Sequence, residues 1–163
     1  MAHVAIVGGG AAGLSAALFT KKNGLETTVF DTDGTWLHKA HLFNYLGIRS
    51  MDGSVFMDRA REHATTDHGA DLREEEVTAV EATGDGFAVT TEEGEYESAY
   101  LVLATGAKRD LAESLGCDFT DEDVVDVDVT METSVEDAYA TGAMVRAEEW
   151  QAIISAGDGA AAA

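Results

Sequence analysis

The sequence predicts a three-layer α/β domain, in which a central parallel sheet has helices on one face and an antiparallel β-meander on the other. Residues 3–31 have the pattern strand, glycine turn, helix and strand, a unit of about the length that a βαβ crossover requires. From Glu76 onward, short strands alternate with tight turns, which is typical of antiparallel pairing. The apolar run Tyr100–Ala104 then fits a buried strand that rejoins the parallel sheet.

The strand–helix–strand unit over residues 3–31 has the clearest sequence pattern. His3–Val7 is a short apolar strand, and Ala11–Asn23 is a helix rich in Ala and Leu. Gly24 suits the left-handed backbone that often ends a helix. β-Branched residues then indicate a second strand over Thr27–Asp31.

The middle of the chain is less regular, because residues 32–51 follow neither a helical nor a strand period. The next segment predicts a helix over Ser54–Thr65 that ends before Gly69. Its expected apolar side carries Val55, Phe56 and Ala60.

The second half begins with the meander, whose expected strands are Val77–Ala82, Phe87–Thr91 and Tyr96–Leu103. Residues 107–132 are mostly polar and acidic, with one further candidate strand at Val124–Val129. A short strand is expected at Ala138–Thr141, and a final helix from about Ala147 to the end.

Acidic residues dominate the charge of the chain. It has 31 acidic and 10 basic residues, a formal net charge of -21, and the acids are spread over most of its length. Such a surface repels nucleic acid and anionic membranes, and its self-repulsion would destabilise the fold at low ionic strength. We therefore expect no nucleic-acid or membrane partner, and a salt-rich cytoplasm as the setting.

Two stretches, residues 1–25 and 34–51, contain no Asp or Glu. Burial of a core strand and helix accounts for part of the first gap. The second gap is not apolar enough for that explanation. Both are candidates for surface that faces an anionic ligand.

Cysteine and histidine placement argues against disulfide and metal chemistry. Cys117 is the single cysteine, so there is no internal disulfide and no Cys-x-x-Cys pair. Its acidic neighbourhood disfavours a reactive thiolate. His38 with His41, and His63 with His68, lack clustered further ligands, and no metal site is expected.

The length of the chain favours one domain over residues 1–163, which can bury a core without disulfides or a structural metal. The apolar stretch Val4–Phe19 is broken by glycines and follows no basic region. This pattern disfavours a signal peptide or a membrane span. A cytoplasmic location is the expectation.

A glycine-rich loop carries the main functional signal. Gly8, Gly10 and Gly13 fit the pattern G-x-G-x-x-G between the first strand and its helix. The first glycine permits the tight turn, the second lets backbone N–H groups reach a pyrophosphate, and the third allows close helix–strand packing. Ala11 and Ala12 open the helix, whose positive end would face the phosphates. Asp31, at the end of the second strand, is placed to accept hydrogen bonds from an adenosine ribose and disfavours a 2′-phosphate.

Nearly the whole chain resembles the FAD-binding domain of thioredoxin reductase-like flavoproteins, a Rossmann-like FAD/NAD(P)-binding domain of the pyridine nucleotide-disulfide oxidoreductase superfamily. Besides the glycine loop, the similar motifs are Leu101–Ala107, Thr133–Gly142, the stretch from Trp150 to Ala161, and Asn44–Gly47. The resemblance implies FAD as cofactor. The residues expected at the site beyond the first motif are Thr32, Trp36, Leu37, Asn44, Val77, Ala104, Thr105, Gly106, Gly142, Ala143, Trp150, Gln151 and Ala152.

The chain departs from this family pattern in three ways. The second flavin motif normally ends in Gly-Asp, whereas here Gly142 is followed by Ala143. Losing that hydrogen bond would weaken FAD binding by about 1–3 kcal/mol. Between residues 106 and 133 there is no room for the NADPH-binding domain of the family, and the Cys-x-x-Cys dithiol is missing.

The expected function is a small FAD-binding oxidoreductase that is not a complete disulfide reductase. Its electrons would come from free NAD(P)H, a separate protein or a second subunit, and no side chain stands out as a catalytic acid or base. A non-catalytic FAD- or NAD-binding module is the alternative, and an NAD-only domain is a third possibility. Relatives of this type commonly pair, so a homodimer is expected.

Overall fold

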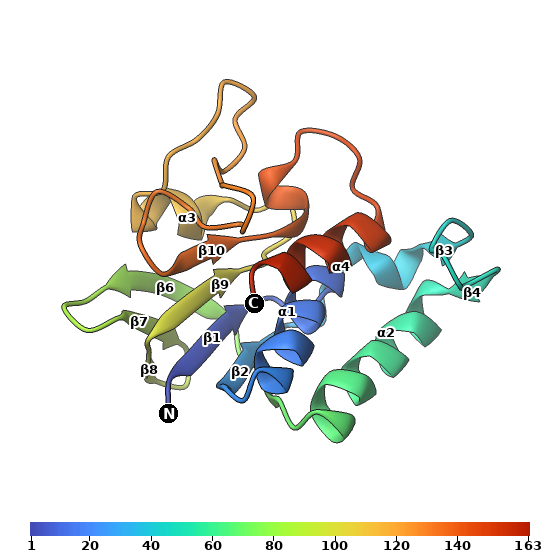
Figure 1. Cartoon of the computed structure of the whole chain (residues 1–163), viewed down its shortest axis with the longest axis horizontal. Helices are drawn as coiled ribbons and strands as arrows, with labels where there is room; N and C mark the ends of the chain where they lie inside the picture. Colours follow the sequence, from blue (N-terminus) through green and yellow to red (C-terminus); the bar gives the residue numbers. More distant parts are fainter.

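The computed structural model describes residues 1–163 and confirms the three-layer α/β architecture (Figure 1). The central sheet is parallel throughout, with strand order β10-β9-β1-β2-β5. In that order the strands are Ala138–Ala140, Tyr100–Leu103, His3–Val7, Glu26–Phe30 and Asp71–Arg73. The edge strand β5 was not predicted, because its three residues are too few to establish a period.

Helices cover one face of the sheet and the meander covers the other (Figure 1). The helical face carries α1 (Ala11–Lys22), α2 (Gly53–Glu62) and α4 (Ala152–Ala161). The opposite face carries β6 (Val77–Ala82), β7 (Phe87–Thr91), β8 (Glu95–Ser98) and the short helix α3 (Asp110–Leu115). No helix combines the length and apolarity needed to span a bilayer.

Strand β1 shows how the sheet is buried on both sides. Val4 and Ile6 pack with the helices, while Ala5 and Val7 pack with the meander. Successive side chains of a strand point to opposite faces, so a strand between two layers must be apolar at every position. This explains why the run His3–Val7 was recognisable in the sequence.

The connections between strands place a crevice at the carboxyl end of β1. From β1 the chain crosses through α1 to β2 on one side, whereas β9 pairs with β1 on the other side. Ligands of open α/β sheets bind where the strand order reverses in this way. The fold therefore places the glycine loop, which follows β1, at the switch point.

The predicted irregular segment 32–51 contains only short elements. These are the 3-10 helix η1 (Trp36–Lys39) and the two-stranded pair β3 (His41–Leu42) and β4 (Met51–Asp52). A π-helical turn, η2 (His63–Asp67), follows α2, and a second 3-10 helix, η3 (Gly142–Val145), follows β10.

Two of the predicted elements were wrong beyond the meander. Val124–Val129 is not a strand: only an isolated bridge links Phe119 with Val125. Val124 and Val125 are apolar because they are buried in the core. The final helix begins at Ala152 and not at Ala147, since the segment before it is held by contacts of Arg146 that are described below.

Two smaller predictions also need correction. Tyr96–Leu103 is not one strand, because the chain leaves the meander after Ser98 and enters the parallel sheet at Tyr100. In α2 the predicted apolar side was right at Phe56 and Ala60, which pack against the core, and wrong at Val55, which is 44% exposed. The residue at the centre of the buried side is Met57, which the prediction left out.

Candidate functional site

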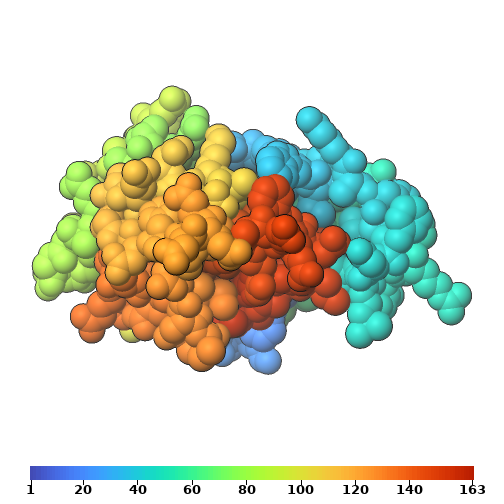
Figure 2. All heavy atoms as spheres, turned by 90° about the horizontal axis from the view of Figure 1, so that it is seen from above, coloured from blue at the N-terminus to red at the C-terminus, as the bar shows by residue number.

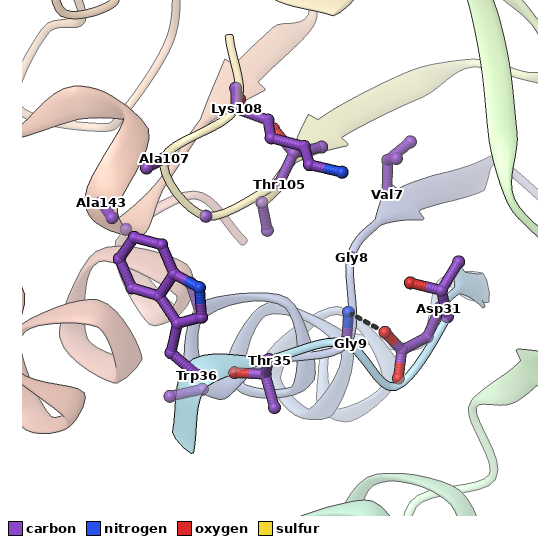
Figure 3. A pocket seen from close by; sticks show the side chains of 18 of the residues that line it. Val7, Gly8, Gly9, Asp31, Thr35, Trp36, Thr105, Ala107, Lys108 and Ala143 are labelled. Atoms are coloured by element: carbon purple, nitrogen blue, oxygen red, sulfur yellow. Dashed lines mark hydrogen bonds between the residues drawn. The ribbon is translucent and has the colours of Figure 1, made fainter. Parts of the chain in front are cut away.

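A pocket of about 800 Å³ lies at the carboxyl ends of β1, β2, β9 and β10 (Figure 3). Most residues expected at the site line it, namely Gly8, Gly10, Ala11, Ala12, Asp31, Thr32, Trp36, Leu37, Val77, Ala104, Thr105, Gly106, Gly142, Ala143, Trp150 and Ala152. Gly13, Asn44 and Gln151 do not line it. Both acid-free stretches contribute, through Val7–Ala12 and through Gly34–Leu37 with Ala40.

The glycine loop is packed too closely for side chains. Gly8 has a left-handed backbone (φ 106°), and a Cβ there would overlap the carbonyl oxygen of Ala104. A Cβ on Gly13 would overlap the carbonyl oxygen of Gly8. Gly13 therefore lets α1 pack against the turn, as its position in the motif predicted.

The first turn of α1 leaves hydrogen-bond donors free beside the pocket. The backbone N–H groups of Ala11, Ala12 and Gly13 cannot pair within the helix, and no backbone bond outside the regular elements uses them. Gly10, at the N-cap, offers no side-chain cap. These donors and the positive end of the helix dipole make the turn suitable for an anion.

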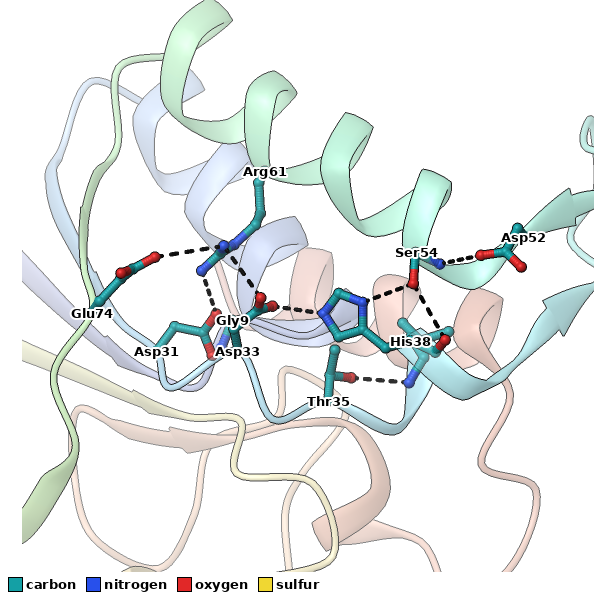
Figure 4. Close-up of polar contacts among 10 residues, drawn as sticks. Gly9, Asp31, Asp33, Thr35, His38, Asp52, Ser54, Arg61 and Glu74 are labelled. Carbon is teal, nitrogen blue, oxygen red and sulfur yellow. Dashed lines mark hydrogen bonds and ion pairs between the residues drawn. The ribbon is translucent and has the colours of Figure 1, made fainter.

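Asp31 is buried at the edge of the pocket and makes two charge-assisted hydrogen bonds (Figure 4). The Gly9 N–H donates to its Oδ1 at 3.1 Å, and Arg61 Nη2 donates to its Oδ2 at 3.0 Å. Arg61 also lies 3.7 Å from Asp33 and 3.9 Å from Glu74. Neither the Gly9 contact nor the role of Arg61, on α2, could be found from the sequence, because their partners are distant along the chain.

The segment that follows Asp31 is fixed to α2 by a chain of polar contacts (Figure 4). His38 Nε2 contacts Asp33 Oδ1 at 2.7 Å, and His38 Nδ1 contacts Ser54 Oγ at 3.2 Å. Asp52 caps α2 by accepting the Ser54 N–H. Thr35 accepts the Leu37 N–H and so begins η1. These contacts hold Trp36 at the pocket wall.

An aromatic pair forms the end of the pocket farthest from Asp31. The indole of Trp36, 63% exposed, lies 5.7 Å from that of Trp150, which is 46% exposed. Seen from above in Figure 2, the light-blue segment around Trp36 meets the red segment that precedes α4. Asn44 Nδ2 donates to Gln151 Oε1 at 3.0 Å, which joins the same two segments outside the pocket.

Contacts of Arg146 hold the segment that precedes α4. Its guanidinium makes a two-pronged pair with the buried Asp158, with Nε at 2.8 Å from Oδ2 and Nη2 at 2.7 Å from Oδ1. Asp158 raises the pKa of Arg146 above its ordinary value. The indole N–H of Trp150 donates to the Arg146 carbonyl at 2.8 Å. The indole thus occupies the carbonyl that a helix starting at Ala147 would use first, and Glu149 has a left-handed backbone (φ 62°), which explains why α4 starts late.

Helix α4 also supports the glycine loop from behind. A Cβ on Gly159 would overlap the backbone of Ala12, and Gly142 lies against the Ala12 side chain with a left-handed backbone (φ 78°). Thr141, which lines the pocket, has a buried hydroxyl with no hydrogen-bond partner. The sequence pattern did not indicate these contacts between the two ends of the chain.

Cys117 lies away from the pocket, buried in the core between the sheet and the meander. Burial raises the pKa of its thiol, and the nearby Asp118 charge adds to the increase. Both effects disfavour the thiolate, which is the reactive form.

The family model of the pyridine nucleotide-disulphide oxidoreductases matches residues 2–52 and 45–158. The chain belongs to this family. Among curated members, thioredoxin reductase of Treponema pallidum (strain Nichols) is 36% identical over 109 residues, covering 64% of this chain and 35% of the relative. The bifunctional thioredoxin reductase/thioredoxin of Mycobacterium leprae (strain TN) is 35% identical over 109 residues, covering 64% of this chain and 24% of the relative. The chain thus spans about a third or less of the length of these relatives.

Solved structures of the family share the fold. The atypical thioredoxin reductase TRi from Desulfovibrio vulgaris Hildenborough superimposes with a TM-score of 0.91 at 18% identity, over 99% of this chain and 95% of that chain. A thioredoxin reductase from Gloeobacter violaceus gives 0.88 at 20% identity, over 99% and 92% of the two chains. This family member therefore has the Rossmann-like FAD-binding domain fold of thioredoxin reductases, with a single cysteine in its 163 residues.

Proposed function

We propose that this family member binds FAD along the pocket and acts as a small flavoprotein oxidoreductase. The observation that carries the proposal is the first turn of α1, whose free N–H groups border a glycine cradle at the switch point of the sheet. A pyrophosphate fits there because Gly8 and Gly10 present backbone and no side chain to the cavity.

The adenosine is proposed to bind at Asp31 and Val77, on the side of the pocket formed by β2 and β6. Each oxygen of the Asp31 carboxylate already accepts one hydrogen bond. Since a carboxylate has about four acceptor positions, two remain for ribose hydroxyl groups. The bond from Arg61 fixes the orientation of the carboxylate, so that its free acceptor positions are held in place for the ribose.

The flavin is proposed to bind at the opposite end, near Ala143 and the pair Trp36–Trp150. Aromatic side chains offer flat apolar faces to a planar ring system. Asn44 and Gln151 would then act indirectly, by holding together the two segments that carry the tryptophans. Ala143 offers no carboxylate to the ribityl chain.

A bound FAD would supply the electron-transfer chemistry, while the protein supplies binding, orientation and electrostatics. Electrons are proposed to come from free NAD(P)H or from a separate protein. Cys117 has no cysteine partner in these residues and is buried, so an internal dithiol relay is not part of the proposal. A homodimer is proposed as the assembly, which light scattering can test.

The acidic surface supports a second part of the proposal, that the protein works in the high-salt cytosol of its cell. A net charge of -21 needs screening by salt. Loss of far-ultraviolet circular dichroism on removal of salt is expected, and a fold that persists unchanged in salt-free buffer would contradict this part.

The test of FAD binding is an absorption spectrum of protein purified in high salt, followed by titration with FAD. Trp36 and Trp150 are the only tryptophans and both line the pocket, so FAD should quench most of the intrinsic fluorescence. Bleaching of the yellow colour by NADH or NADPH would support an enzyme. A colourless protein that binds no added FAD would overturn the proposal.

The replacement of the family's acid by Ala143 favours a second candidate, a non-catalytic module that uses FAD or NAD as a structural or sensing ligand. Such a module would bind the nucleotide but would show no reduction by either nicotinamide. An NAD-only site would leave the end of the pocket near Ala143 without a role in ligand binding.

A further inference from the structure

The charges that line the pocket are unevenly matched. Four acidic side chains border it, Asp31, Glu75, Glu76 and Asp110, and Lys108 is the one basic residue among the lining residues. A ligand with phosphates would meet repulsion from uncompensated acids. Lys108 is therefore the one charged side chain of the lining that can offset this repulsion by direct contact with a phosphate.

Two of these acids have their own partners. Asp31 pairs with Arg61, and Glu75 accepts hydrogen bonds from the hydroxyls of Thr91 at 2.7 Å and Tyr96 at 2.9 Å. Lys108, in contrast, makes no side-chain hydrogen bond and no ion pair, although the chain has 31 acidic residues. Its ammonium group is available to a ligand.

The backbone around Lys108 is held by a turn at the end of β9. The Thr105 hydroxyl donates to the Lys108 carbonyl, the Lys108 N–H lies 3.4 Å from the Thr105 carbonyl, and Gly106 has a left-handed backbone (φ 68°). In Figure 3 the side chain extends over Thr105 toward Val7, on the wall that faces the glycine loop. The turn thus places Lys108 in the pocket lining, on the wall that faces the glycine loop.

We propose that Lys108 is a phosphate-binding residue, whose ammonium donates to the pyrophosphate of the bound dinucleotide from the side opposite the helix N-terminus. The pyrophosphate would then lie between two positive groups, one made by the backbone and one by a side chain. This inference rests on the proposed nucleotide site and assigns a specific residue to the phosphate within it.

The test compares Lys108→Met with Lys39→Met, both made in the full chain. Lys39 is also exposed and without an ion pair, but it does not line the pocket, so the two variants change the net charge equally. Affinity for FAD is measured by quenching of tryptophan fluorescence, and affinity for ADP, which has the pyrophosphate and no flavin, is measured by isothermal titration calorimetry. Circular dichroism confirms folding of each variant.

Lys108→Met is expected to weaken both FAD and ADP about five- to tenfold in about 1 M KCl, with a smaller loss in about 3 M KCl because salt screens the contact. Lys39→Met should leave both affinities unchanged, and Lys108→Arg should retain most of the binding. Equal affinities for Lys108→Met and the parent protein would overturn the inference. Absence of FAD and ADP binding in the parent protein would instead overturn the proposed site itself.

Discussion

The two ends of the pocket are built by different means. The pyrophosphate end consists of buried backbone: Gly8 and Gly13 lie in contact with other backbone atoms, and Asp31 is only 6% exposed. The aromatic end consists of exposed side chains on irregular segments, with Trp36 at 63% exposure and Trp150 at 46%.

The two ends therefore differ in their tolerance of substitutions. At the pyrophosphate end the residues that form the site are also packed in the core, so a substitution there disturbs both ligand binding and the fold. At the aromatic end the side chains are held by a few polar bonds, such as that between Asn44 and Gln151, and can change without loss of the fold.

Gly13→Ala should have the largest effect, because its Cβ would overlap the Gly8 carbonyl oxygen. We expect loss of about 3 kcal/mol in the free energy of unfolding and no measurable FAD binding. Gly157→Ala is the matched control, since Gly157 also lies in a helix but its Cβ would meet nothing within 4 Å. This control should gain about 0.5–1 kcal/mol. Chemical denaturation measures both, and equal stabilities would refute the proposed packing role.

Asp31→Ala should rank second, because it leaves Arg61, 21% exposed, without its closest partner. A loss of about 2 kcal/mol in stability and a fall of about tenfold or more in FAD affinity are expected. Glu74→Ala is the control: its side chain is 77% exposed, its Arg61 distance is 3.9 Å, and it does not line the pocket. If both variants bind FAD equally well, Asp31 does not hold the ribose.

Ala143→Asp tests the aromatic end by introducing the aspartate that normally follows the glycine in the family's second flavin motif. FAD affinity should rise about tenfold without a change in thermal stability, since a carboxylate could accept a hydrogen bond from the ribityl chain. Ala107→Asp adds the same charge at another lining position and should not raise affinity. A decrease in both variants would indicate that the flavin does not lie at Ala143.

Cys117 should give the smallest effect and should leave FAD binding unchanged. Burial raises its pKa in the folded state, so its contribution to stability is complete below the thiol's ordinary pKa and is lost as the pH rises through the folded value. We expect the free energy of unfolding to fall by about 1 kcal/mol between about pH 8 and about pH 10, with a smaller decrease in Cys117→Ala. Tyr139, whose pKa burial also raises, contributes in the same direction, so Tyr139→Phe provides the second comparison. Identical pH dependence in the parent protein and Cys117→Ala would contradict the expectation.

Prediction from sequence succeeded where local rules decide the structure. The run His3–Val7, the glycine pattern and the position of Asp31 each depend on residues close in sequence. The helix at Asp110–Leu115 and the strand at Asp71–Arg73 were missed because they are short. The start of α4 was wrong because Glu149 has a left-handed backbone (φ 62°) and the Trp150 indole occupies the Arg146 carbonyl.

Period, turn chemistry and the absence of side chains at the glycines are local properties, and they were enough to predict the three layers and the glycine cradle; the switch point follows from the strand order of the folded sheet. Only the tertiary structure decided that Arg61 orients Asp31, that α4 supports Ala12, and that Lys108 faces the glycine loop. Those contacts join residues far apart in the chain. Their geometry follows from how the layers pack, which no local pattern encodes.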